Sequence, residues 1–113
     1  MGKVGRRIDD PKTGSYVPIT LDSGEKIEVA HNKGGFKGGM LTIQVLKFGF
    51  GSDRILSCDL DREEGRNAIT LLIRDASQTS IEVTPLGALV EYVKDCKSVD
   101  DVQAKCAALM SGH

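Results

Sequence analysis

The sequence predicts a single α+β domain in which five to six antiparallel strands form a curved sheet or small barrel, followed by a C-terminal two-helix hairpin. Three observations predict this class. Apolar and polar residues alternate in short segments between residues 16 and 83, as in half-buried strands. Turn residues separate these segments. Residues 85–111 instead carry apolar residues at helical spacing, and 113 residues suffice for one core.

The N-terminal part is expected to contain a tail and one hairpin. Residues 1–15 are rich in glycine and charged residues, which predicts a flexible tail ahead of a domain that spans residues 16–113. A strand over residues 16–21 follows, and Pro18 indicates a sheet edge because proline cannot donate a ladder hydrogen bond. Gly24 supplies the positive φ of a hairpin turn, and residues 25–31 form the second strand.

Two later segments, residues 40–48 and 68–74, are expected to be strands with apolar residues on both faces. Strands of this kind are covered on both sides. Either the sheet therefore closes into a barrel, or a second subunit covers the face that the helices leave open. Residues 54–60 form a strand between them, and residues 81–83 form a short last strand.

Two C-terminal helices, residues 85–97 and 99–111, carry the clearest local signals. Thr84 is suited to the N-cap of the first, and proline follows at the first helical position, where its missing N–H costs nothing. Ser98 is suited to the N-cap of the second, with an acidic residue three positions later. Apolar residues at helical spacing predict one buried stripe on each helix.

Composition excludes several classes of protein. Fifteen basic and sixteen acidic residues give a net charge of −1, so no bulk attraction to nucleic acid or to a membrane surface is expected. The three cysteines lack a C-x-x-C spacing, which favours a reducing cytoplasm over a disulfide scaffold. Apolar runs are too short for a spanning helix, so we expect a cytoplasmic protein without membrane contact.

No residue pattern indicates a cofactor or a metal, and none is expected. The acidic residues between positions 59 and 64 alternate as in a calcium loop, but the glycine and the closing glutamate of that loop are missing at the required positions. A polar turn is the interpretation we adopt. Cys58 lies between leucines in the middle of a strand, where a thiol is usually an inert core group. We predict no catalytic residue.

The glycine-rich segment Lys33–Gly39 is the region whose composition suggests binding. The backbone N–H groups of such loops can converge on an anion. A P-loop is excluded because Met40 and Leu41 stand where that motif needs lysine and serine or threonine. Basic residues flank an aromatic one here, which supports contact with nucleic acid or another anion. The candidate binding residues are His31, Lys33, Phe36 and Lys37.

Three functions stay open. The first is a small non-enzymatic binding or protein-interaction module that self-associates, as a homodimer, because two helices cannot cover all the predicted apolar surface. The alternative is a nucleic-acid or anion-binding module that uses loop 32–39. The second alternative is a small enzyme with a pocket near His31. A loop that only connects two strands, with no binding role, is the opposing interpretation of loop 32–39.

Overall fold

The computed structural model of this chain describes residues 2–12, 14–33, 38–46, 52–76 and 84–111. They form one antiparallel sheet and three helices, an α+β arrangement as predicted. The four long strands are neighbours in sequence order: β3 (Gly14–Thr20), β4 (Lys26–Asn32), β5 (Met40–Leu46) and β6 (Ser52–Asp59). Two short strands, β1 (Lys3–Val4) and β2 (Ile8–Asp10), pair with the outer edge of β3.

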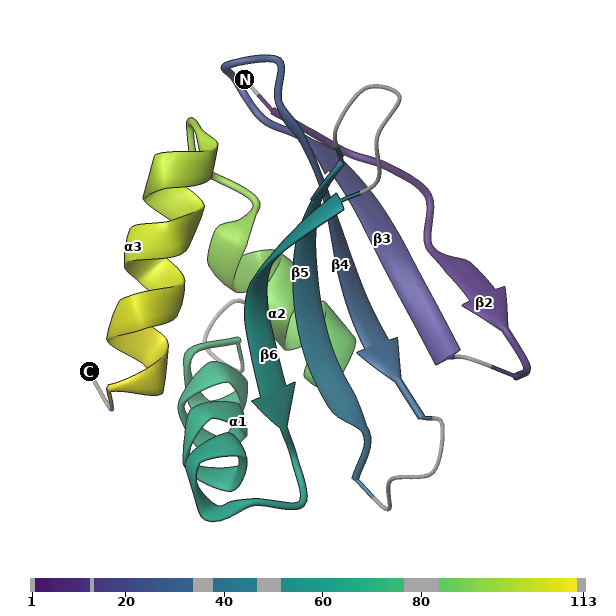
Figure 1. Cartoon of the computed structure of the whole chain (residues 1–113), viewed down its shortest axis with the longest axis vertical. Helices are drawn as coiled ribbons and strands as arrows, with labels where there is room; N and C mark the ends of the chain where they lie inside the picture. Colours follow the sequence, from purple (N-terminus) through teal and green to yellow (C-terminus); the bar gives the residue numbers. More distant parts are fainter. Residues whose placement is uncertain (1, 13, 34–37, 47–51, 77–83, 112–113) are drawn as a thin grey trace.

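The sheet is open, so the predicted barrel closure does not occur among the described strands (Figure 1). β6 forms one edge, and β1 with β2 forms the other. β1 and β2 have two and three residues, and five or more is usual for a strand, so this edge is too short to close a barrel. They lie within the segment that we expected as a flexible tail, and all of their residues are exposed.

The sheet edge predicted from Pro18 is wrong for β3, because β1 and β2 pair with its outer side; Pro18 lies between these two paired segments. Leu21 N donates to Glu25 O across the hairpin. Hydrogen-bonded pairs alternate along an antiparallel ladder, so Ile19 and Val17 also form hydrogen-bonded pairs with β4. The N–H that proline lacks at position 18 would therefore point away from β4. The carbonyl of Pro18 points the same way and accepts from Gly5 N at 2.7 Å. A proline is therefore tolerated in a strand that is fully paired on its other side.

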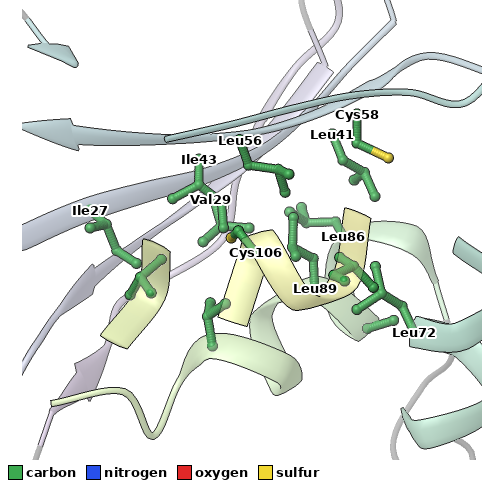
Figure 2. Close-up of a cluster of buried hydrophobic side chains, with 14 of the residues drawn as sticks. Ile27, Val29, Leu41, Ile43, Leu56, Cys58, Leu72, Leu86, Leu89 and Cys106 are labelled. Atoms are coloured by element: carbon green, nitrogen blue, oxygen red, sulfur yellow. The ribbon is translucent and has the colours of Figure 1, made fainter. Parts of the chain in front are cut away.

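One face of the sheet carries the hydrophobic core. Register aligns Val17, Val29, Ile43 and Leu56 across the four long strands, and side chains that are opposite in register share a face. Figure 2 shows Val29, Ile43 and Leu56 above the apolar side chains of the helices, among them Leu72, Leu86, Leu89 and Cys106. The strand alternation predicted for the two N-terminal strands is confirmed by the burial of Val17, Ile19, Ile27 and Val29.

Three helices cover this face, where we expected two. They are α1 (Glu63–Ala76), α2 (Pro85–Val93) and α3 (Val99–Met110). The strand predicted for residues 68–74 is wrong, because these residues belong to α1. The buried positions of α1 are Gly65, Ala68, Leu72 and Ala76, spaced by three and four residues as a helix requires. Two glutamates in its first turn interact favourably with the positive end of the helix dipole.

The two predicted N-caps are confirmed. The side chain of Thr84 accepts from Gly87 N at 3.0 Å, and Ser98 accepts from Asp101 N at 3.4 Å. The turn prediction at Gly24 is also confirmed by its φ of 89°. Residues 81–83 and Phe48, which we expected in strands, lie outside the described residues.

The second face of the sheet has no helix over it in the described part of the chain (Figure 1). Its central row is Tyr16, Ala30, Thr42 and Ser57, which are opposite one another in register. Small and polar side chains thus form the centre of this face, whereas Met40 and Leu46, at the two ends of β5, place apolar groups on it as the two-sided pattern predicted, and Leu46 is 40% exposed. None of the described helices is long and apolar enough to cross a membrane.

Candidate functional site

A small hollow lies where the N-terminus of α2 meets the C-terminal end of β4. Its volume is about 230 Å³. The residues that line it come from three separate parts of the chain: Arg7, Ser15, His31, Lys33, Thr84, Pro85 and Leu86. Two of the four predicted binding residues, His31 and Lys33, are therefore placed together here. Phe36 and Lys37 lie outside the described residues.

The N-terminus of α2 supplies one side of the hollow. Thr84 caps the helix through the Gly87 N–H, and Pro85 at the first position has no N–H to offer. Among the first three helical residues this leaves the amide of Leu86, whose side chain is buried beneath the hollow. The positive end of the helix dipole therefore faces the hollow with a single main-chain donor that the cap does not use.

Two cationic side chains, Arg7 and Lys33, give the hollow its charge, and one carboxylate opposes them. Arg7 Nε donates to Asp9 Oδ1 at 2.9 Å, and Ser15 Oγ donates to the same oxygen at 2.5 Å. Two hydrogen bonds hold the pKa of Asp9 below its ordinary value, and the bond from Ser15 has a larger effect than the bond from Arg7. Asp9 is thus ionised at neutral pH, and the formal charge of the three groups is +1.

His31 stands on the helix-facing side at the end of β4, opposite Ser15 and Leu41 in register. This is the face that the alternation of Ile27 and Val29 predicted. Its Nε2 lies 2.9 Å from the carbonyl oxygen of Gly38. A carbonyl can only accept, so Nε2 carries the proton and donates, which makes Nδ1 an acceptor in the neutral ring.

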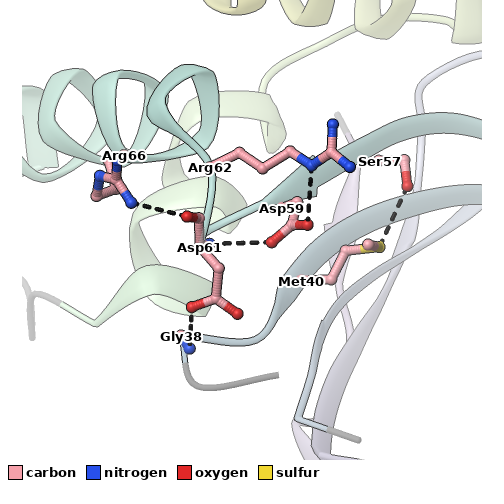
Figure 3. Close-up of polar contacts among 7 residues, drawn as sticks. All are labelled: Gly38, Met40, Ser57, Asp59, Asp61, Arg62 and Arg66. Atoms are coloured by element: carbon pink, nitrogen blue, oxygen red, sulfur yellow. Dashed lines mark hydrogen bonds and ion pairs between the residues drawn. The ribbon is translucent and has the colours of Figure 1, made fainter. Parts of the chain in front are cut away.

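The end of the glycine-rich loop is held in place by this histidine and by the turn after β6. Gly38 N donates to Asp61 Oδ1 at 2.8 Å (Figure 3), and Leu60 N donates to Gly39 O at 3.0 Å. Gly39 has a φ of 83°, and a Cβ there would lie 2.5 Å from His31 Nε2. Only glycine fits this position without displacing the ring.

Asp59 at the end of β6 and Asp61 in the turn before α1 have structural partners, whereas Glu63 and Glu64 of the predicted polar turn belong to the first turn of α1. Asp59 Oδ1 accepts from Asp61 N at 2.9 Å, and Asp59 Oδ2 lies 3.5 Å from Arg62 Nε. Arg66 reaches back to the carbonyl of Asp61 at 2.7 Å, as Figure 3 shows. Within the described ranges, no cluster of three or more His, Cys, Asp or Glu side chains could hold a metal ion.

All three cysteines are free and buried, as expected of core thiols. Burial raises the pKa of Cys106 to about 12 and raises the pKa values of Cys58 and Cys96 as well. The nucleophile in thiol chemistry is the thiolate, which such a pKa suppresses at neutral pH. Cys58 Sγ instead lies 3.9 Å from the carbonyl oxygen of Gly65 in α1.

Sequence reasoning missed Arg7 and Ser15. It placed residues 1–15 in a tail, although the Asp-Asp-Pro-Lys segment was recognisable as a turn. A turn between Ile8 and Tyr16, which are opposite in register, is a hairpin signal. Thr84 was identified as a cap, but the sequence could not show that the capped end lies beside His31.

Comparisons with known proteins identify no relative. No protein-family model matches the chain, and neither the curated proteins nor the solved structures searched gave a match.

Proposed function

We propose that this chain is a non-enzymatic binding module whose ligand presents a small anionic group, such as a phosphate, to the hollow at the N-terminus of α2. The observation that carries the proposal is the convergence of Arg7, Lys33 and His31 with that helix end. Arg7 directly precedes β2, His31 lies in β4 and Lys33 directly follows β4, so only the folded chain assembles these basic side chains.

The chemistry of the hollow suits an oxyanion of limited size. Arg7 and Lys33 donate charge-assisted hydrogen bonds, the Leu86 amide can donate along the helix axis, and the hydroxyl of Ser15 is near the same position. A volume of about 230 Å³ accommodates a phosphate or carboxylate group and leaves the rest of a larger ligand outside. A ligand that bridges to Arg7 would compete with Asp9 for the guanidinium.

A titration with inorganic phosphate, followed by amide chemical shifts in two-dimensional NMR, tests the proposal. We expect weak, salt-sensitive binding that perturbs Leu86, Ser15 and His31. Neutralising Arg7 and Lys33 together, by Arg7→Gln with Lys33→Gln, should weaken affinity by about tenfold or more. The matched control is Lys26→Gln with Lys97→Gln, which removes the same charge from exposed residues outside the hollow. Equal losses in both double variants would contradict a specific site.

Asp9 provides a test of opposite sign. Because Asp9 occupies Arg7 and reduces the positive potential, Asp9→Asn should tighten phosphate binding several-fold. A weaker affinity in this variant would mean that Asp9 positions Arg7 for the ligand instead of competing with it. Either result is visible in the same titration.

A single-stranded oligonucleotide is the probe for the nucleic-acid alternative. The specific observation in favour is that Lys33 at the base of loop 32–39 lines the hollow. Oligonucleotide affinity that depends on Arg7 and Lys33, with a steep salt dependence, would support this alternative. The enzyme alternative has less support, because the Nε2 of His31 is engaged by Gly38 and the carboxylate of Asp9 by Arg7 and Ser15.

A further inference from the structure

β6 is a long strand at an open edge of the sheet. It has eight residues and pairs with β5 on one side, and no other described strand pairs with it. Proteins usually protect such edges with lysine, proline, short strands or an irregularity. β6 contains neither lysine nor proline, and its central residues, Ile55 to Cys58, are uncharged. Its one irregularity is a bulge near Ile55, which leaves the segment from Leu56 to Asp59 in regular register.

The alternation of hydrogen bonds shows which backbone groups of β6 face away from β5. Leu60 N donates to Gly39 O, so this pair is a hydrogen-bonded one. Residues two apart repeat the pattern in an antiparallel ladder, so Cys58 and Leu56 also direct their backbone groups toward β5. Ser57 and Asp59 therefore direct their N–H and C=O groups away from β5, and at Asp59 this side is in contact with Gly65 of α1. The Asp59 carbonyl already accepts from Arg62 N at 3.1 Å, which makes Ser57 the central donor and acceptor.

The bulge makes β6 complementary to itself in charge. Arg54 is opposite Gln44 and Asp59 is opposite Met40, so both lie on the face without helices, with the extra residue, Ile55, between them. Ser57 is opposite Thr42 of β5. Arg54 and Asp59 are opposite Gln44 and Met40, which lie two residues from Thr42 on either side, so Arg54 and Asp59 are equally far from Ser57 along the ladder. A second β6 that runs antiparallel, with Ser57 at the two-fold axis, therefore places each Arg54 opposite the Asp59 of the other copy.

The side chains can make this pair. Arg54 is exposed and forms no ion pair within the described part of the chain. Asp59 contacts a mostly exposed Arg62 at 3.5 Å, and its carboxylate has capacity for a further donor. On the helix side the same register brings Cys58 opposite Leu56 of the second copy, which matches apolar with apolar.

α3 offers a second contact surface beside this edge. A hollow of about 310 Å³ lies between β6 and α3, lined on the strand by Arg54, Ile55 and Leu56 and on the helix by Gln103, Cys106, Ala107 and Met110. The helix residues carry no charge, and Met110 is 36% exposed. In a two-fold arrangement that continues the sheet, the helices of both copies lie on the same side. The uncharged flank of each α3 therefore faces the other copy.

We propose that two copies of this chain associate edge to edge through β6, in the register that pairs Ser57 with Ser57 and Arg54 with Asp59. The two sheets then form one continuous sheet. This interface lies at the opposite edge of the sheet from β2 and is independent of the anion site, so either proposal can fail without the other.

Sedimentation velocity of the full chain at micromolar concentrations tests the association, and we expect a reversible dimer. Ser57→Pro removes the central outward donor without removing a backbone hydrogen bond to β5, because Ser57 is not in a hydrogen-bonded pair with Thr42; it also removes the bond from Ser57 Oγ to Met40 Sδ, 3.2 Å long. It should raise the dimer dissociation constant by about tenfold or more. Ser57→Thr keeps the donor and is the control. A monomeric wild-type chain, or a dimer unaffected by Ser57→Pro in a variant with a native circular dichroism spectrum, overturns the proposal.

A cross-linking experiment decides the register even where the proline variant fails to fold. Hydrogen-bonded antiparallel partners have Cα atoms about 5.5 Å apart, within the range that a disulfide spans. Ser57→Cys should form an intermolecular disulfide under mild oxidation, seen on a non-reducing gel, while the native cysteines are buried. Lys3→Cys, on the exposed strand β1, reports random collisions. Cross-linking of Ser57→Cys no faster than that of Lys3→Cys would overturn the proposal.

Discussion

Replacing Gly39 by alanine tests the link between the glycine-rich loop and His31. The added Cβ would lie 2.5 Å from His31 Nε2 and 2.8 Å from Asn32 O. Alanine must also adopt a φ of 83°, which costs about 1–2 kcal/mol for a residue with a Cβ. Moving the ring would break its bond to Gly38 O, worth about 1 kcal/mol. We therefore expect Gly39→Ala to lower the free energy of unfolding by about 2–4 kcal/mol.

Gly24→Ala is the matched control for this substitution. Gly24 has a φ of 89°, but nothing lies within 4 Å of its added Cβ. Gly24→Ala should lower the free energy of unfolding only by the cost of the positive φ, about 1–2 kcal/mol. Alanine restricts the unfolded chain equally in both variants, so the difference between them isolates the contact with His31. Urea unfolding followed by circular dichroism measures both.

If both variants lose the same free energy of unfolding, the reasoning is refuted, because displacing the His31 ring would then cost nothing. A second reading comes from the anion site. If His31 is displaced, Gly39→Ala should also weaken phosphate binding, whereas Gly24→Ala should not.

Three further predictions concern other parts of the fold. Thr84→Ala removes the N-cap of α2 and should lower the free energy of unfolding in urea by about 1 kcal/mol. Thr84→Ser keeps a hydroxyl and should retain most of this stability. No loss with alanine would mean that Pro85 alone defines the helix start. Cys106, with a pKa of about 12, should resist alkylation by iodoacetamide at pH 8 in the folded chain and react after denaturation; rapid alkylation of the native chain would contradict its burial. Asp9 has a folded pKa below its unfolded value, so its contribution to stability is present above 3.8 and is lost as pH falls below 3.8 through the folded pKa. Ser15→Ala should move that pKa, measured by NMR titration of the carboxyl, back toward 3.8, and an unchanged value would show that the Ser15 hydroxyl does not bind Asp9.

Some elements were determined by the sequence alone because their signals are local. Thr84 and Ser98 cap α2 and α3 by side-chain bonds to residues three positions later. Gly24 closes the β3–β4 hairpin through its own backbone freedom. The alternation of Val17, Ile19, Ile27 and Val29 identified the core face of that hairpin. Each of these features depends on residues within a few positions of one another.

The segment from Glu63 to Ala76 shows where local signals fail. The residues Ala68 to Arg74 satisfy a strand period and a helix period at once, and their apolar residues on both alternating faces led to the strand prediction. The choice is made by packing: Ala68, Leu72 and Ala76 are each 2% exposed or less, and only a helix places these three on one side. The alanines among them let α1 lie close to β6 and α2. This packing depends on elements outside the segment, so the segment's own sequence does not reveal it.

The proposed binding site divides in the same way. The sequence suggested His31 and Lys33, because an unusual loop follows β4 directly. It could not identify Arg7, Ser15 or the end of α2 as their neighbours, since these residues are separated from His31 by 16 to more than 50 positions in the chain. The tertiary structure alone brings them together: antiparallel pairing places Ser15 opposite His31, and helix packing against the same sheet face sets the capped end of α2 beside them.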